Sequence, residues 1–334
     1  MEAHTRAAIE GFINRSGHAQ ESHIEQAQLL SGGAIQENWL IRVQIEGGPH
    51  AGLLEAVVRT DAPSGVSTSH SRAEEFALLK TVFAAGVTVP EPLWLCEDGG
   101  VIGRPFFIMR RVSGNAAGHA LVKHADRHPE LAERLGAELA RIHSIKPPQA
   151  ALGFLHLTEE PPASRLIKRW REFLDNHQTP YPVLEWGLRW LERHAPLTKG
   201  VTLCHRDFRT GNYMVDERGL TGILDWEFAD WSDPMEDIGW FCAKCWRFGA
   251  NGREAGGIGK REDFYRGYEG VSGKSLDRQQ VHYWEVVAHL NWAVIAIQQA
   301  QRHLSGQEPS LLLALTGHLV PELEWEILNL TEAS

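Results

Sequence analysis

Cysteine is scarce in this chain of 334 residues: it occurs four times, at positions 96, 204, 242 and 245. Four cysteines are too few for the disulfide framework of a small secreted scaffold, so we expect a reducing, cytoplasmic environment. The lone Cys242-x-x-Cys245 pair lacks the second pair of ligands that a structural zinc site requires. We interpret both residues as buried thiols.

Long apolar runs are absent as well. The chain has no stretch of about 18 apolar residues, and its N-terminus has no apolar signal-peptide core, so we expect no membrane association. Basic residues number 33 against 43 acidic ones, which gives a net charge of −10. This balance argues against a nucleic-acid or anionic-membrane partner. The sequence does not indicate an oligomeric state.

The N-terminal third is rich in predicted strands. Residues 38–45 alternate in polarity, with Trp39, Ile41, Val43 and Ile45 on one face, which is typical of a half-buried strand. Turn residues separate this segment from further short apolar runs. The pattern predicts strands at 38–45, 53–59, 93–96 and 106–112, and helices at 2–13, 20–27 and 71–85.

The sequence after Gly114 is mainly helical. An amphipathic helix is predicted at 129–145, and tryptophan-rich helices at 164–177 and 182–194. A short strand at 201–204, a hairpin at 213–224 and further helices from residue 234 follow. We therefore predict an α+β fold with a small lobe at 1–112 and a larger helical lobe at 113–334.

The strongest chemical signal is the segment His205-Arg206-Asp207-Phe208-Arg209-Thr210-Gly211-Asn212. It matches the kinase catalytic-loop pattern H-R-D-x-x-x-x-N. An alcohol that attacks a γ-phosphoryl group needs an acceptor for its proton, and Asp207 provides one. Asn212 offers an uncharged oxygen ligand for Mg²⁺. Arg209 either neutralises charge on the transferring group or is simply a solvated arginine.

A second acidic motif follows 13 residues later. Asp225 ends an apolar strand, where a carboxylate can bridge Mg²⁺ to phosphate oxygens. Glu227 is a candidate second ligand or water holder. Either motif alone is also explained by turns or helix caps; their occurrence together, in this order, favours phosphoryl transfer.

The small lobe holds the predicted nucleotide residues. Ala56-Val57-Val58-Arg59 corresponds to the V-A-I-K strand of kinases, with arginine in place of the lysine that contacts phosphates. Glu75, on the inward stripe of its helix, is the expected partner of Arg59. The backbone at Gly32 and Gly33 is expected to cover the phosphates, although this turn alone is also typical of a simple hairpin.

These motifs resemble those of the aminoglycoside-phosphotransferase-like, or choline-kinase-like, kinases. The family loop reads H-G-D-x-x-x-x-N and precedes a strand ending in I-D-W-E, here Ile223-Leu224-Asp225-Trp226-Glu227. The G-D-P-x-x-D-L element corresponds to Ser232–Ile238, in which Asp237 resembles the helix aspartate that braces the catalytic loop. The resemblance extends from residue 29 to about residue 300 and is nearest to the branch fused, in some proteins, to acyl-CoA dehydrogenases.

The resemblance implies a bilobal, protein-kinase-like fold. A small antiparallel sheet with one helix forms the nucleotide-binding lobe, and the mainly helical lobe carries the catalytic loop and substrate site. Residues 109–112 resemble the interlobe hinge, so backbone groups at Arg110 and Val112 are expected to bind adenine.

Together these features predict an ATP- and Mg²⁺-dependent enzyme that phosphorylates a hydroxyl group of a small molecule. We expect the acceptor near helices 164–177 and 285–300, with His289, Asn291 and Trp292 as possible contacts or simply packed residues. An inactive nucleotide-binding pseudokinase stays open because of Arg59, as does an aminoglycoside kinase, which would need a carboxylate cluster. A peptide acceptor is disfavoured because a helix begins directly after Asp233. The identity of the acceptor and the choice between ATP and GTP stay open.

Overall fold

The computed structural model describes residues 1–30, 36–61 and 69–332. The chain divides into two compact units. The first comprises Met1–Asn115, Pro148–Phe154 and Asn212–Ala229, and the second comprises Ala116–Pro147, Leu155–Gly211 and Asp230–Ser334. Within the described ranges, every helix is too short or too polar to cross a membrane.

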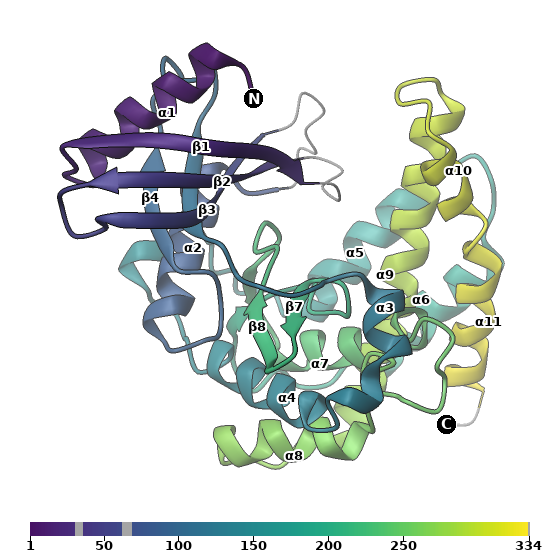
Figure 1. The fold of residues 1–334 in the computed structure, drawn as a ribbon. Helices are drawn as coiled ribbons and strands as arrows, with labels where there is room; N and C mark the ends of the chain where they lie inside the picture. The colour runs from purple at the N-terminus through teal and green to yellow at the C-terminus, as the bar shows by residue number, and fades with distance from the viewer. Residues whose placement is uncertain (31–35, 62–68, 333–334) are drawn as a thin grey trace. The chain divides into compact units, whose positions relative to one another are not determined.

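A five-stranded antiparallel sheet forms the centre of the first unit (Figure 1). Its spatial order is β1-β2-β3-β5-β4. The strands are β1 (Glu21–Leu30), β2 (Gln36–Glu46), β3 (Gly52–Asp61), β4 (Pro92–Cys96) and β5 (Phe106–Arg110). The strands predicted at 38–45, 53–59, 93–96 and 106–112 are thus confirmed.

The prediction of a helix at 20–27 is wrong, because this segment lies mostly in strand β1. Ser22 and Ile24 are buried while the residues on either side of each are exposed. This two-residue period is that of a strand, but it is too brief to be distinguished from a helix turn in the sequence. Pairing with β2, which matches Ile24 with Val43, fixes the segment as a strand.

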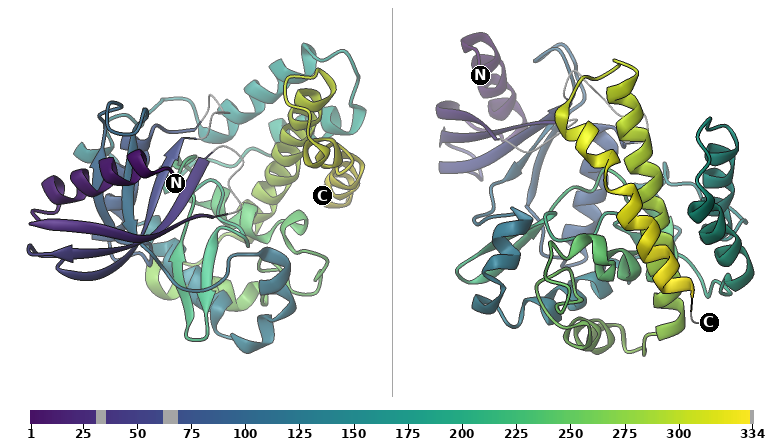
Figure 2. Two further views of the ribbon diagram at one scale, coloured as in Figure 1. Left: turned by 45° about the horizontal axis from the view of Figure 1, so that its top comes forward. Right: turned by 90° about the vertical axis from the view of Figure 1, so that its right-hand side faces the viewer.

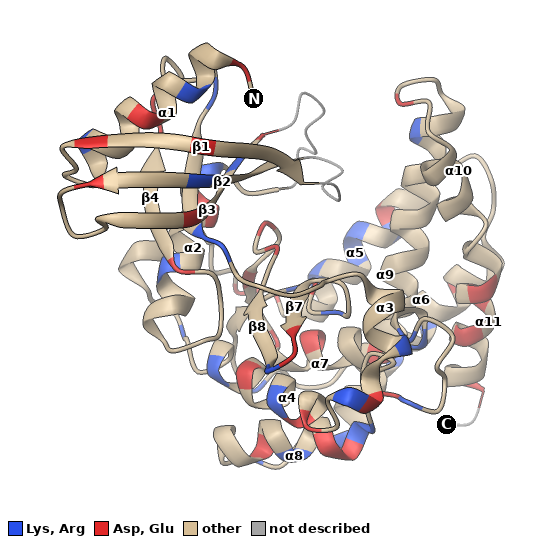
Figure 3. Ribbon diagram, in the orientation of Figure 1, with Lys and Arg blue, Asp and Glu red and all other residues tan. Residues whose placement is uncertain are grey.

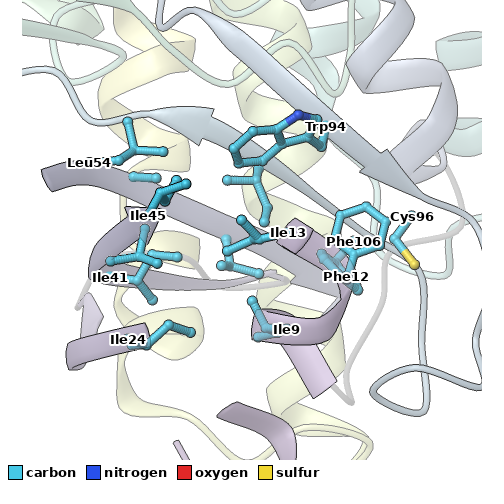
Figure 4. Packing of buried hydrophobic residues seen from close by; sticks show 14 residues of the cluster. Ile9, Phe12, Ile13, Ile24, Ile41, Ile45, Leu54, Trp94, Cys96 and Phe106 are labelled. Carbon is cyan, nitrogen blue, oxygen red and sulfur yellow. The ribbon is translucent and has the colours of Figure 1, made fainter. Parts of the chain in front are cut away.

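Helices cover both faces of the sheet. Helix α1 (Ala3–Ser16) packs Ile9, Phe12 and Ile13 into a cluster that includes Ala56 and Val58 of β3 (Figure 4). Alternate side chains of a strand point to opposite faces, so Arg59 faces away from α1. Helix α2 (Arg72–Ala84) lies on that second face, and a capping box between its N-cap residue and Glu74 begins it.

Two segments from far downstream in the sequence complete the first unit. The 3₁₀ turn η2 (Ala150–Leu152) contacts α2. Strands β7 (Tyr213–Asp216) and β8 (Gly219–Ile223) form the predicted hairpin. The segments on either side of this hairpin carry Asn212 and Asp225, so the hairpin determines the positions of both residues within this unit.

The second unit is mainly helical. Its short strands β6 (Thr202–Cys204) and β9 (Asp230–Ser232) pair in antiparallel fashion, and α10 and α11 both pack along α9 (Figure 2). Its α-helices are α3 (Gly118–Lys123), α4 (Leu131–Ile142), α5 (Pro162–Asp175), α6 (Pro182–His194), α7 (Pro234–Cys242), α8 (Arg261–Ser272), α9 (Arg278–Leu304), α10 (Leu311–Gly317) and α11 (Val320–Thr331). The 3₁₀ turns are η1 (Ala125–Arg127) and η3 (Lys244–Trp246).

Glycines permit a close contact between helices α4 and α8 of the second unit. A Cβ at Gly136 of α4 would collide with the backbone oxygen of Phe264, and one at Gly267 of α8 would collide with that of Glu133. The two backbones therefore approach at reciprocal glycines. This contact supports α4, which also packs against β6, the strand that leads into the predicted catalytic loop.

Candidate active site

The predicted catalytic loop begins in the second unit, directly after β6. His205 is fully buried, and Arg206 has a left-handed backbone with φ of 63°. Such a conformation is costly for a residue other than glycine and is found often at functional sites. It turns the chain so that Asp207, the next residue, is partly exposed, with 17% of its side-chain surface accessible.

Asp237 of α7 holds this loop. Its carboxylate accepts hydrogen bonds from the backbone N–H groups of His205 and Arg206, both at 2.7 Å. His143 Nε2 lies 3.1 Å from the same carboxylate, and His143 Nδ1 lies 2.9 Å from the Tyr268 hydroxyl. Asp237 therefore has the bracing position that the family resemblance implied.

The electrostatics of Asp237 fit an ionised brace. Burial by itself would raise the pKa of Asp237, but the hydrogen bonds from His143 and the His205 backbone outweigh it and lower this pKa. Cys204 lies beside the pair, and burial raises the pKa of its thiol well above the usual value. A neutral thiol next to a carboxylate already engaged by two N–H groups fits a structural network better than a metal centre.

Asp207 is held by two neighbours in its own unit. Its Oδ1 accepts hydrogen bonds from Arg209 Nε at 3.0 Å and from Trp240 Nε1 at 3.1 Å. The Arg209 guanidinium also lies over the Trp246 ring, 4.7 Å from its centroid. Arg209 is therefore an orienting partner of Asp207, and Trp240 is a contact that sequence reasoning missed, because only the fold of α7 brings it to the loop.

The first unit holds the residues predicted to bind the nucleotide and the metal ion, and Arg59 links several of them. Arg59 Nη2 lies 2.9 Å from Glu75 Oε1, the partner expected from the sequence, and 3.0 Å from Asp225 Oδ1. Its Nη1 donates to Asn38 Oδ1 at 3.4 Å. Only 5% of Arg59 is exposed. The guanidinium thus joins β3, α2 and the segment after β8, which a single lysine amine could do less well.

Arg72 is a second buried cation of this network. It forms an ion pair with Glu75 and another, at 2.9 Å, with Asp61. Sequence reasoning missed Arg72, although its position three residues before Glu75 on the same helix is a recognisable signal for a pair. Glu75 is therefore shared by two arginines.

Asn212 and Asp225 are brought together by the ends of the β7–β8 hairpin. The Leu224 N–H donates to the Asn212 carbonyl at 2.8 Å, which joins the segments carrying the two residues. Asp225 has a left-handed backbone, with φ of 61°, and 36% of its side chain is exposed. Asn212 is buried, with 4% of its surface exposed. The carboxylate of Asp225 and the amide oxygen of Asn212 are of the ligand types that Mg²⁺ prefers.

Glu227 is more enclosed than Asp225. Gln36 Nε2 donates to its Oε2 at 2.6 Å, a contact between residues 191 positions apart that the sequence alone did not reveal. Burial raises the pKa of Glu227 to about 7, although the charge of Arg59 acts in the opposite direction. Proximity to Glu75 and Asp225 adds to the rise, as expected for a carboxylate in a cluster of like charge.

The remaining predicted nucleotide residues are less informative. Gly32 and Gly33 lie outside the described residues. Arg110 ends β5, and its side chain forms an exposed ion pair with Glu91 at 2.6 Å. Val112 is half-buried and lies against Gly222 of β8, where an added Cβ would come within 3.2 Å of it. The side chain of Arg110 is thus engaged elsewhere, which leaves the expected adenine contacts to the backbone.

The residues considered as acceptor contacts lie on α9. His289 is buried, and its Nδ1 lies 2.7 Å from the Glu285 carbonyl one turn earlier. Burial lowers the pKa of His289 to about 4, so the ring is neutral. Trp292 packs on Trp246, with ring centroids 4.9 Å apart. Helix packing accounts for both residues.

Sequence comparison identifies a protein family and relatives that match part of this chain. The sequence model of a family described as "Phosphotransferase enzyme family" matches residues 26–274. Acyl-CoA dehydrogenase family member 10 of Mus musculus is 29% identical over 188 residues, or 54% of this chain and 17% of that protein. Family member 11 of Gallus gallus is 29% identical over 192 residues, or 55% of the chain and 24% of that protein. The match thus spans a small fraction of these much longer relatives.

Solved structures share the fold at low sequence identity. A provisionally assigned aminoglycoside phosphotransferase from Ralstonia eutropha JMP134 aligns with a TM-score of 0.75 and 20% identity, and covers 98% of both chains. A spectinomycin phosphotransferase solved with ADP and spectinomycin aligns with a TM-score of 0.65 and 12% identity over 96% of this chain and 98% of its own. A choline/ethanolamine kinase family protein from Mesorhizobium loti has a TM-score of 0.58 and 17% identity, and the alignment covers 92% and 88% of the two chains. The predicted kinase-like fold and the family resemblance are confirmed.

Proposed function

Because the chain belongs to the phosphotransferase enzyme family, we propose that it transfers the γ-phosphoryl group of ATP to a hydroxyl group of a small molecule, with Mg²⁺ as cofactor. The observation that carries this proposal is the braced catalytic loop. Asp237 holds the backbone on the N-terminal side of Asp207, and Arg209 and Trp240 hold the Asp207 carboxylate, which is still partly exposed. A carboxylate fixed in this way is prepared to accept a proton.

In the proposed reaction, the acceptor oxygen attacks the γ-phosphorus and forms the new P–O bond. The bond between the γ-phosphorus and the oxygen that bridges to the β-phosphate breaks, and ADP leaves. The hydroxyl proton passes to the Asp207 carboxylate, which releases it to solvent afterwards. Arg209 keeps this carboxylate in one orientation through its 3.0 Å contact, and we assign it an orienting role, with charge neutralisation as the alternative.

The oxygen atoms of Asn212 and Asp225 would hold Mg²⁺, and Glu227 would add a ligand or hold a bound water. The donor set fits, since hard divalent cations take carboxylate and amide oxygens. When bound, the ion would neutralise the charge of the β- and γ-phosphates. Within the protein, Arg59 positions Asp225 and Glu75 through its ion pairs, so we assign it the task of aligning the metal ligands and the phosphates.

A nucleotide-binding protein without transfer activity is the second candidate. The replacement of the usual lysine by Arg59, whose side chain pairs directly with Asp225 at 3.0 Å, is the observation that favours it. A neutral hydroxylated acceptor and an aminoglycoside are both within the first proposal. The spectinomycin and hygromycin B bound in related structures indicate only that such acceptors suit this kind of fold.

The deciding experiment measures ADP release from Mg²⁺–ATP over a panel of hydroxyl-bearing metabolites and antibiotics. We expect turnover with at least one acceptor, and a loss of about 10²- to 10⁴-fold in kcat for Asp207→Asn, since a general base contributes this much. Asp225→Asn should raise the Mg²⁺ concentration needed, and EDTA should abolish turnover. Nucleotide-dependent thermal stabilisation without ADP release from any acceptor would support the non-catalytic candidate. Full activity of Asp207→Asn would remove Asp207 from the role of base.

A further inference from the structure

Helix α5 carries an arginine that forms no ion pair with any residue in the described part of the chain. Four basic residues lie on this helix, Arg165, Lys168, Arg169 and Arg171 (Figure 3). Arg165 and Arg171 both pair with acidic side chains. Among the residues that the structure describes, Arg169 has neither a hydrogen-bond nor an ion-pair partner for its side chain. An exposed cation on a helix is ordinary in itself, so the surroundings of Arg169 decide its meaning.

Those surroundings are positively charged and include the catalytic loop. Arg206, which precedes Asp207, and Arg165 are both close enough to act on Arg169 through their charges. Arg206 pairs with Glu236 at 3.1 Å and with Asp230 at 3.7 Å, and Arg165 shares Asp230 at 3.8 Å. Three cations therefore face two carboxylates, and the positive charge left over is that of Arg169.

The pKa of Arg169 reflects this excess of positive charge in part. Crowding around the guanidinium lowers the pKa of Arg169, the nearby charge of Arg206 lowers it further, and Glu236 compensates only in part. Arginine stays protonated throughout the physiological range. When a folded protein holds a cation next to like charges, binding of an anion at that position is favourable, because it offsets their repulsion.

A hollow beside Arg169 has room for an anionic group and for the rest of the small molecule that carries it. This hollow of about 410 Å³ lies where α5 and the C-terminal part of α9 meet, and its lining residues are Arg169, Glu172, Phe173, Asn176, His177 and Gln301. Phe173 supplies an apolar wall. Gln301 Nε2 of α9 lies 2.5 Å from Nε2 of His177, which follows the C-terminal end of α5. The size suits a small metabolite.

We propose that this hollow binds the hydroxyl acceptor and that Arg169 recognises a carboxylate or phosphate group on that acceptor. The inference rests on the proposed function and narrows it to anionic hydroxylated substrates. Arg206 links the recognition site to the loop that carries Asp207, so binding of the anionic group would orient the acceptor hydroxyl towards the base. Glu172, the single acid of the hollow, is the competing feature that would favour a cationic acceptor.

The first test measures anion binding without any catalysis. Inorganic phosphate and acetate are titrated separately into the full-length protein by calorimetry, at constant ionic strength and with a non-hydrolysable ATP analogue and Mg²⁺ present. We expect Arg169→Gln to weaken binding of at least one anion about tenfold, as for loss of one charge-assisted hydrogen bond. Lys168→Gln removes an equal charge from the adjacent, exposed position and should leave binding unchanged. Equal anion binding by both variants, or no binding by the wild type, would overturn the inference.

The second test compares matched acceptors in the ADP-release assay. Two pairs each compare an anionic compound with an uncharged one: 3-hydroxybutyrate with 1,3-butanediol, and glycerol 3-phosphate with glycerol. 2-Aminoethanol is added as a cationic probe. We expect kcat/KM to favour one anionic member, and Arg169→Gln to reduce this preference about tenfold while Lys168→Gln retains it. A preference for the cationic probe would overturn the inference and leave the kinase function intact. Arg169-dependent anion binding without ADP release would refute the kinase function but support the anion site.

Discussion

The brace formed by Asp237 makes a quantitative prediction. The buried carboxylate of Asp237 accepts hydrogen bonds from the backbone N–H groups of His205 and Arg206, both at 2.7 Å, and lies 3.1 Å from His143 Nε2. Asp237→Asn keeps the volume but removes the charge and presents an NH₂ donor where donors already converge. At least one buried N–H group loses its acceptor, and each such loss costs about 1–3 kcal/mol. We expect the free energy of unfolding to fall by about 3–5 kcal/mol, as for a broken buried charge network.

The pH dependence of the free energy of unfolding provides a second test with the same variant. The pKa of Asp237 is lowered in the folded protein from the ordinary value of 3.8, so its contribution is fully present above this value. The contribution is lost as the pH falls below about 4, through the folded pKa. We would measure the free energy of unfolding by urea titration at several pH values between 7 and 3. The wild type should lose stability below about pH 4, and Asp237→Asn should lose less, because it lacks the contribution of this carboxylate.

A surface variant separates the brace from a general effect of charge removal. Asp263→Asn on α8 removes a charge from a partly exposed ion pair with Arg266, which should change stability by less than about 1 kcal/mol. If Asp237→Asn unfolds within about 1 kcal/mol of the wild type, or if its pH profile parallels that of the wild type, the carboxylate does not hold the catalytic loop as described.

Two further predictions concern the first unit and the α4–α8 contact. Arg59→Lys retains the charge but loses the fork that reaches both Glu75 and Asp225, so we expect a loss of about 1–3 kcal/mol in thermal unfolding and a higher KM for ATP; an unchanged KM would contradict the alignment role. Gly136→Ala places a methyl group against the Phe264 backbone and should destabilise the protein by about 1–3 kcal/mol. Gly270→Ala, on α8 with open space around its Cβ, should be neutral or slightly stabilising; equal effects of the two glycine variants would contradict close packing there.

Local sequence patterns were sufficient for much of the fold. Strands β2 to β5 and helices α4 to α6 follow from polarity patterns that repeat over several residues, because one face of each element is buried. Strand β1 was predicted as a helix. Its polar sequence carries only two buried residues, and pairing with β2 overrides this weak local preference.

In the candidate active site, too, some features could be predicted from local sequence and others could not. The motif residues Asp207, Asn212 and Asp225 are identifiable because their chemistry requires particular residue types at fixed spacing. Long-range contacts were not identifiable in this way: Gln36 with Glu227 and Trp240 with Asp207 join positions far apart in sequence. Such pairs leave no periodic trace, since nothing in either local segment depends on the other until the chain has folded.

The sequence by itself determined the order of the chemical groups, the family and the type of most secondary-structure elements, since these depend on near neighbours along the chain. Only the tertiary structure decided that residues 212–229 pack with the N-terminal sheet and that Arg59 joins Glu75 to Asp225. It also decided that Arg169, which has no ion-pair partner among the described residues, lies near the charges of Arg206 and Arg165. The physical reason is that burial and charge balance depend on which distant segments exclude water from one another, and this is fixed by packing in three dimensions.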